Sequence, residues 1–175
     1  TYLYDANGAL TAVTDNGNTK QFNYDLAGNL LSATVSGKTI DYIIDGKNRR
    51  VAKKVNGIIQ QRFIYQDQLN PIAELDKDNN VISRFIYGEK MNVPSYMEKG
   101  GNTYRIISDH LGSVRLVVDI SDGTIAQQLS YDANGNVLED TNPSFQPFGY
   151  AGGIYDTDTS LVRFGARDYD PISAR

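Results

Sequence analysis

Four side chains between residues 108 and 113 are of the types that support nucleophilic catalysis. Ser108, Asp109, His110 and Ser113 supply hydroxyl, carboxylate and imidazole groups, and His110 is the only histidine of the chain. A catalytic triad is recognised by its geometry, and three neighbours in sequence rarely converge in space. We therefore favour a structural role, in which His110 bonds a backbone carbonyl and fixes a turn. On this interpretation, His110→Ala lowers stability and abolishes no activity.

A basic cluster provides the second group of candidates: Arg49, Arg50, Lys53 and Lys54. In an extended strand Arg50 and Lys54 share one face, while Arg49 and Lys53 share the other. Lysines on an exposed strand discourage sheet aggregation, so we predict a solvated or edge-guarding strand here. The chain has 17 Lys and Arg against 21 Asp and Glu, a formal net charge of −4. This balance disfavours nucleic acid and anionic membranes as partners, because both require a basic surface.

The sequence predicts no cofactor and no metal site. The chain has no cysteine and one histidine, which excludes disulfides, thiolate metal sites, cysteine nucleophiles and histidine-rich metal sites. The acidic run 76–80 lacks the glycine and glutamate of a calcium-binding loop, and we predict a turn there. Gly100-Gly101 and Gly152-Gly153 precede no helical pattern, so they are interpreted as turn glycines rather than a phosphate cradle. No apolar run approaches the ~18 residues of a membrane span.

The elements that position these side chains are predicted to be strands and turns. The 175 residues include 12 Tyr, 6 Phe and 16 Gly. Tyrosine and phenylalanine suit a pleated surface, whereas glycine, asparagine and aspartate favour turns. This length is sufficient for one domain with a sizeable core. The chain begins at Thr1 without a signal-peptide pattern, and we expect it to be a piece of a longer protein.

An internal repeat determines the predicted architecture. The heptapeptide YDANGAL at 4–10 returns as YDLAGNL at 24–30 and as YDANGNV at 131–137, and looser copies lie between them. The aromatic residue closes a strand, and the aspartate caps the turn by accepting from a backbone N–H two or three residues on. Asn-Gly is a strong signal for a type I′ hairpin turn. It occurs at 7–8, 16–17, 56–57 and 134–135.

We predict an all-β fold of tandem antiparallel β-hairpins that pair edge to edge into a curved, continuous sheet. A spacing near twenty residues leaves two strands of about six residues and two turns in each repeat. A single hairpin is marginally stable in water, so neighbouring hairpins must pair. The alternative is an ordinary β-sandwich with coincidental turns, which three near-copies of one heptapeptide disfavour.

The repeats resemble the YD repeats of RHS proteins. DHLGSVR at 109–115 is similar to a stretch of the RHS repeat-associated core domain, and PFGYAG at 147–152 followed by LVRFGARDYDP at 161–171 is similar to the end of that core. We therefore divide the chain into a YD-repeat hairpin array, 1–100, and the end of the core, 101–175. The resemblance implies that the sheet is part of a hollow RHS cocoon.

The resemblance also implies a function. The segment would be a structural part of the shell of a secreted bacterial RHS toxin, enclosing the C-terminal toxin of the same polypeptide. Similar shells occur in the C component of insecticidal toxin complexes and in teneurins, which use them in cell adhesion. The expected location is extracellular or at the bacterial cell surface, and components of a secretion apparatus or a cell-surface glycan are further expected partners.

Self-cleavage ahead of the toxin is a further implication of the resemblance. It would depend on an aspartic-protease-like pair, in which one carboxyl acts as base while the other acts as acid. Asp170 is the residue carried over, with Arg167 as a neighbour able to hold its charge and Asp168 as a weaker candidate. The alternative is that Asp170-Pro171 is a turn and Arg167 forms a salt bridge. The chain departs from the family at Ala174, where glycine is expected, and it ends before the second DP motif.

A carbohydrate- or cell-surface-binding β module is the second function class. Tyrosine rings can stack on sugar faces, so exposed rings in a shallow groove favour this class, whereas buried rings favour the shell. An enzyme acting on an external substrate has the least support. At this length the strip cannot close, so we expect an unpaired edge or a bare face, or a sheet that folds back to cover that face.

Overall fold

The structure, a computed structural model, describes residues 1–175 and is almost entirely β. Fourteen strands form one antiparallel sheet in which each strand pairs with its neighbours in sequence, β1 to β14; we call this the wall sheet. Its strands are β1 Tyr2–Tyr4, β2 Leu10–Asp15, β3 Asn18–Tyr24, β4 Leu30–Val35, β5 Lys38–Ile44, β6 Arg50–Val55, β7 Ile58–Tyr65, β8 Pro71–Leu75, β9 Val81–Ile86, β10 Tyr96–Lys99, β11 Asn102–Ser108, β12 Val114–Asp119, β13 Ile125–Tyr131 and β14 Val137–Asp140. The prediction of an all-β fold of tandem hairpins is confirmed.

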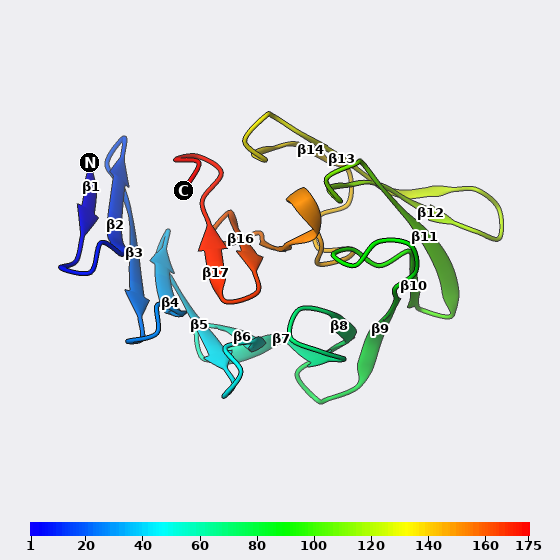
Figure 1. The fold of residues 1–175 in the computed structure, drawn as a ribbon, viewed down its shortest axis with the longest axis horizontal. Coiled ribbons are helices and arrows are strands. Elements are labelled where there is room, and N and C mark those ends of the chain that lie inside the picture. The colour runs from blue at the N-terminus through cyan, green and yellow to red at the C-terminus, as the bar shows by residue number, and fades with distance from the viewer.

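Three further strands form a separate antiparallel sheet, the C-terminal sheet. It consists of β15 Ile154–Asp156, β16 Leu161–Phe164 and β17 Arg167–Tyr169, and it follows a single turn of 3₁₀ helix, η1, at Tyr150–Gly152. The wall sheet curves around this C-terminal segment, which lies on the concave side (Figure 1). The wall sheet does not close, because β1 and β14 each have one neighbour. The chain therefore folds back onto its own concave face.

Two kinds of turn alternate from β1 to β8 of the wall sheet. The short turns Asn16-Gly17 and Asn56-Gly57 have positive φ at both residues, the type I′ geometry predicted for Asn-Gly. At Asn7-Gly8 and Asn134-Gly135 only the glycine has positive φ, so the prediction of type I′ turns is wrong at these two places. Both Asn-Gly pairs lie in longer turns that begin at the aspartate of the YD repeat, and we call these turns YD loops. In a YD loop, hydrogen bonds to this aspartate set the path of the backbone.

The YD loop at Asp25 shows how that longer turn is held. Its Oδ1 accepts hydrogen bonds from the N–H groups of Ala27 at 2.9 Å and Asn29 at 2.8 Å, and its Oδ2 accepts one from the Asn29 side chain at 2.8 Å. The hydrogen bond from the Asn29 amide lowers the pKa of Asp25. The predicted capping by aspartate is confirmed, with the bonds made two and four residues on.

The YD loops also shift the strand register. In the β3–β4 pair Phe22 lies opposite Ala33, but Tyr24 lies opposite Leu30, because a bulge intervenes. The same shift recurs at the end of β1, β5, β7, β11 and β13. A bulge places two residues opposite one and increases the local twist, so its repetition is consistent with the curvature of the wall sheet.

Two apolar cores lie on the concave side. The N-terminal core includes Leu30 and Ile40 with Leu161 of the C-terminal sheet, and the second core includes Met97 and Phe85 with Phe148. The C-terminal segment thus contributes to both cores. It supplies the apolar cover that a curved, open sheet requires on its inner face.

The division predicted between 1–100 and 101–175 falls in the turn of the β10–β11 hairpin, where Lys99 pairs with Asn102. The wall sheet continues through this turn. The division stays a prediction about the sequence. The only helical segment, η1, is far too short to cross a bilayer, and no helix of the structure is long and apolar enough to do so.

Candidate functional site

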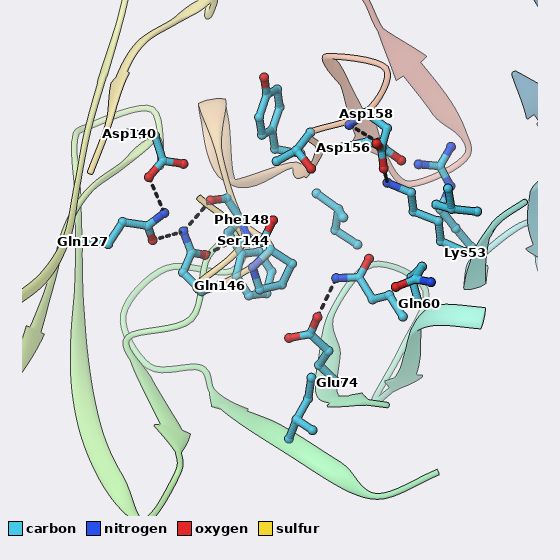
Figure 2. A pocket seen from close by; sticks show the side chains of 18 of the residues that line it. Lys53, Gln60, Glu74, Gln127, Asp140, Ser144, Gln146, Phe148, Asp156 and Asp158 are labelled. Carbon is cyan, nitrogen blue, oxygen red and sulfur yellow. Dashed lines mark hydrogen bonds and ion pairs between the residues drawn. The ribbon is translucent and has the colours of Figure 1, made fainter. Parts of the chain in front are cut away.

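A cavity of about 500 Å³ lies between the concave face and the C-terminal segment. We call it the inner cavity. Side chains from β5 to β10, β13 and β14 line it on the wall side, and 144–148 and 154–158 line it on the other. Most of these side chains are polar, and the labelled ones surround the space in Figure 2. The concave face is therefore apolar toward its two ends and polar in between.

Lys53 lies at the centre of the first polar cluster. Its ammonium group lies 2.7 Å from a carboxylate oxygen of Asp156 and 2.7 Å from one of Asp158, as Figure 2 shows. The Tyr42 hydroxyl donates to the second oxygen of Asp156 at 2.7 Å, and Lys38 lies 2.8 Å from Asp158. Burial acts to raise the pKa of Asp158, but hydrogen bonds from Lys38 and Lys53 outweigh it and lower that pKa.

Asp168 of β17 is the centre of the second cluster. Its two carboxylate oxygens each lie 2.7 Å from an arginine, one from Arg50 of β6 and the other from Arg163 of β16. All three side chains are less than 5% exposed. Arg163 also donates to the side chain of Asn29 and to the backbone carbonyl of Asn48. This cluster joins the C-terminal sheet to two YD loops of the wall.

The Arg50 guanidinium also lies over the Tyr42 ring, 3.6 Å from its centroid. Burial and the Asp156 carboxylate raise the pKa of the Tyr42 hydroxyl, so this group remains a hydrogen-bond donor. A desolvated cation over an aromatic face is a favourable contact. Tyr42 therefore links the two clusters, because it contacts Arg50 through its ring and Asp156 through its hydroxyl.

The predicted role of the basic cluster is wrong. Arg50 and Lys53 are buried rather than solvated, and β6 is an interior strand of the wall sheet. The alternation assumed for this strand is interrupted by the bulge at the YD loop, where Ile44 lies opposite Arg50 while Ile43 lies opposite Ala52. Because the bulge inserts one residue, Arg50 and Lys53 reach the same face.

Glu74 borders the inner cavity without a cationic partner. Its side chain accepts from the amide of Gln61 at 2.6 Å and from the Ser83 hydroxyl at 3.4 Å. Burial raises the pKa of Glu74, although these hydrogen bonds and the charge of Lys99 act against that rise. A buried carboxylate that is not paired with a cation is unfavourable, and Glu74 differs in this from Asp156, Asp158 and Asp168, which all have cationic partners.

The aspartates predicted for self-cleavage lie close in sequence but have different surroundings. Asp168 is fully engaged by two arginines. Asp170 accepts from the Ile172 N–H at 3.0 Å and from the Ser173 hydroxyl at 2.8 Å, which closes a turn at Asp170-Pro171. Arg167 is exposed and forms no ion pair. The structure shows no ion pair between Arg167 and Asp170, and the catalytic roles stay predictions.

The structural role predicted for His110 is wrong. His110 is exposed and makes no hydrogen bond, so the turn does not depend on it. The neighbouring Asp109 holds the turn: it accepts from the N–H groups of Leu111 at 3.0 Å and Ser113 at 2.9 Å, and from Arg115. Burial acts to raise the pKa of Asp109, but these bonds outweigh it and lower that pKa. Position 109 is the aspartate of a YD loop.

The run at 76–80 forms the predicted turn. Asp76 accepts from the N–H groups of Asp78 at 2.8 Å and Asn80 at 2.9 Å. No three His, Cys, Asp or Glu side chains in the structure are arranged to hold a metal ion. The polar groups of the inner cavity are mostly satisfied by one another, so the arrangement is suited to fastening segments together.

No sequence pattern pointed to Asp156 and Asp158. Their importance comes from contacts with Lys53 and Lys38, which are more than 100 residues away in sequence. The repeat offered one signal, because Lys53 stands at the position that Ala33 occupies twenty residues earlier. A cation at a position that is apolar in the two preceding repeats, at Val13 and Ala33, indicates a specific partner.

Comparison with known proteins gives one consistent result. A family model described as Teneurin YD-shell matches residues 1–175. Teneurin-1 of Gallus gallus is 35% identical over 160 residues, which is 88% of this chain and 6% of that protein. The tRNA3(Ser)-specific nuclease WapA of Bacillus spizizenii is 35% identical over 175 residues, which is 98% of this chain and 7% of that protein. The chain therefore spans a small part of the length of these relatives.

Solved structures share the fold. The crystal structure of TcdB2-TccC3 matches with a TM-score of 0.68 at 20% identity, covering 97% of this chain and 9% of that chain. The Photorhabdus luminescens Tc holotoxin pore matches with a TM-score of 0.65, also at 20% identity, over the same shares of the two chains. At this level of identity the likeness concerns the fold alone.

Proposed function

Because the chain belongs to the teneurin YD-shell family, we propose that it is a stretch of shell wall in a longer protein, with its concave face toward an enclosed cargo. One observation carries this proposal: fourteen strands pair strictly in chain order into a curved sheet that does not close. Both edge strands have a free side, at which further hairpins can pair. Such a sheet is a wall that extends by addition of repeats.

The cargo we propose is a toxin that follows the shell in the same polypeptide. Two comparisons support this choice: WapA is named as a nuclease, and the matching solved structures include a Tc holotoxin. On this proposal the longer protein is a secreted bacterial RHS toxin, located outside the cell or at its surface. The shell keeps the toxin sequestered until delivery, and a component of the secretion apparatus is a further proposed partner.

Protease protection in the longer protein tests the shell. Met97 is fully buried in the second core, whereas Met91 is 85% exposed, so Met97→Asp and Met91→Asp form a matched pair. We expect the segment after Arg175 to resist added protease in the unmodified protein and with Met91→Asp. With Met97→Asp the wall opens and the segment is digested. Digestion in the unmodified protein as fast as that of the isolated segment would contradict the proposal.

Self-cleavage is a separate part of the proposal, assigned to Asp170 with Arg167 and Asp168. Asp170→Asn retains an oxygen that can accept from the Ile172 N–H, so this variant is expected to fold. In the longer protein it should remain uncut, while Asp122→Asn, at an exposed turn, should be cut normally. Normal cleavage of Asp170→Asn excludes Asp170 as the catalytic group.

The glycan-binding alternative receives less support from the tyrosine rings. Tyr42 and Tyr131 are buried, and the hydroxyls of Tyr65 and Tyr87 donate to backbone carbonyls of Arg50 and Pro71 at 3.0 Å. Rings whose hydroxyls bond the preceding hairpin are used for packing between repeats. A glycan array probed with the chain is expected to return no specific binder.

A further inference from the structure

The wall sheet is repetitive, so the C-terminal sheet could in principle dock against more than one pair of strands. Neighbouring repeats are two strands apart, a displacement of about 10 Å. Apolar contacts such as that of Leu161 with the N-terminal core discriminate poorly between adjacent repeats, because the hydrophobic effect is non-directional. Something other than apolar burial must select one position.

The charged side chains on the concave face differ from one repeat to the next. Strand pairing defines the first equivalent position as the residue opposite the end of the preceding strand: Leu10, Leu30, Arg50, Pro71, Val114 and Val137. Three residues further on, the second position is occupied by Val13, Ala33, Lys53, Glu74, Val117 and Asp140. Among these six repeats, only the one with Arg50 and Lys53, the basic pair, has a cation at either position.

We propose that the basic pair is a docking determinant that selects an acidic β-sheet segment, here the C-terminal sheet, and fixes its position along the wall. Arg50 meets Asp168, while Lys53 meets Asp156 and Asp158, each at 2.7 Å. A buried ion pair is a recognised means of specifying one arrangement among similar ones. The two contacts lie on different strands of the C-terminal sheet, so together they fix its orientation as well.

The neighbouring repeats reject the same segment. A shift of one repeat toward the C-terminus would bring Asp156 and Asp158 to Glu74 and Asp168 to Pro71. A shift toward the N-terminus would place Asp156 and Asp158 against Ala33 and Asp168 against Leu30. Asp156 and Asp158 would then lose Lys53, and Asp168 would keep only Arg163 of its own sheet, which is unfavourable for buried carboxylates. Glu74 thereby has a role that its own contacts do not explain, because its charge excludes an acidic segment from its repeat.

Distances between two spin labels test this proposal in the intact chain. The chain contains no cysteine, so Thr39→Cys on β5 and Arg167→Cys on β17 give a single labelled pair at two exposed positions. In the otherwise unmodified chain we expect one narrow distance. Arg50→Leu/Lys53→Ala, which copies the preceding repeat into the basic pair, should replace it by a broad distribution while the β-sheet signal in circular dichroism is retained. One narrow, unchanged distance in this variant overturns the proposal.

A second variant decides the matter if Arg50→Leu/Lys53→Ala does not fold. Pro71→Arg/Glu74→Lys copies the basic pair into the next repeat and leaves the original pair in place. We expect a second peak in the distance distribution, from molecules in which the C-terminal sheet has docked one repeat, about 10 Å, further along the wall sheet. The matched control Pro71→Leu/Glu74→Ala removes the acidic charge without adding cations, and it should keep one distance. If Arg50→Leu/Lys53→Ala does not fold and Pro71→Arg/Glu74→Lys shows only the distance of the unmodified chain, the proposal is overturned.

Discussion

The β3–β4 and β5–β6 hairpins have the same pairing geometry but different chemistry. In each, an inward aromatic residue pairs with the second position of the repeat, Phe22 with Ala33 and Tyr42 with Lys53. A bulge follows in both, opposite Leu30 in one hairpin and Arg50 in the other. Both hairpins contribute to the N-terminal core, but at these two positions the first is apolar, whereas the second binds the C-terminal sheet through buried charges.

This difference shows that the backbone of the repeat and the role of its inward residues are specified separately. The turn residues and bulges place one side chain at each equivalent position, whatever its chemistry. Apolar residues at these positions build core that any neighbour can cover. Charged residues at the same positions require a particular partner, because an unpaired buried charge is costly. The two hairpins should therefore respond differently to substitution.

The largest expected effect is at Asp168. Asp168→Ala leaves the buried cations Arg50 and Arg163 without their common partner, and we expect a loss of about 3–5 kcal/mol in the free energy of unfolding. Urea denaturation measures this. The control is its exposed neighbour, since Arg167→Ala should change stability by no more than about 0.5 kcal/mol. If both variants unfold at the same urea concentration, the buried ion pairs do not hold the C-terminal sheet.

The apolar hairpin is tested at Leu30, which is fully buried. Leu30→Ala leaves a cavity in the N-terminal core, and we expect it to lower the free energy of unfolding by about 2–5 kcal/mol. Leu26 lies in the same YD loop but is fully exposed, so Leu26→Ala is the matched control and should be nearly neutral. If Leu30→Ala lowers the free energy of unfolding no more than Leu26→Ala does, the buried core position contributes no more to stability than the exposed loop position.

A smaller effect is expected in the YD loop at 109–115, where the neighbouring residues Asp109 and His110 contribute differently to stability. Asp109→Ala removes the acceptor of two backbone N–H groups and of Arg115, for an expected loss of about 1–3 kcal/mol. His110→Ala should change stability by no more than about 0.5 kcal/mol, because the imidazole is exposed and unbonded. Thermal unfolding of both variants measures the difference, and the reverse order would restore the structural role first predicted for His110.

The features that could be predicted from the sequence are those fixed within one repeat. Asp25 and its equivalents cap their own loops, and Asn16-Gly17 sets its own turn, so the tandem hairpins and their order followed from local patterns. The buried position of Arg50 did not follow, because one bulge changes the phase of strand alternation. The contacts of Asp156 could not be predicted either, since its partners lie over 100 residues away on a different sheet. Repetition specifies the wall, but the docking of the last sheet depends on residues that depart from the repeat.

Glu74 extends the comparison to a third repeat, because its carboxylate points inward but has no cationic partner. Burial raises its pKa in the folded chain, so the folded state takes up this proton at a higher pH than the unfolded state does. Rising pH therefore destabilises the folded state through this group, and the effect is largest above the raised pKa. Glu74→Gln retains an oxygen that can accept from Gln61 and carries no charge. We expect Glu74→Gln to raise the unfolding temperature at pH 8 by a few degrees and to leave it nearly unchanged at pH 4, where the folded state holds the proton. Equal unfolding temperatures at pH 8 would mean that the Glu74 carboxylate is compensated in the cavity, which would place it with the paired charges of the neighbouring repeat.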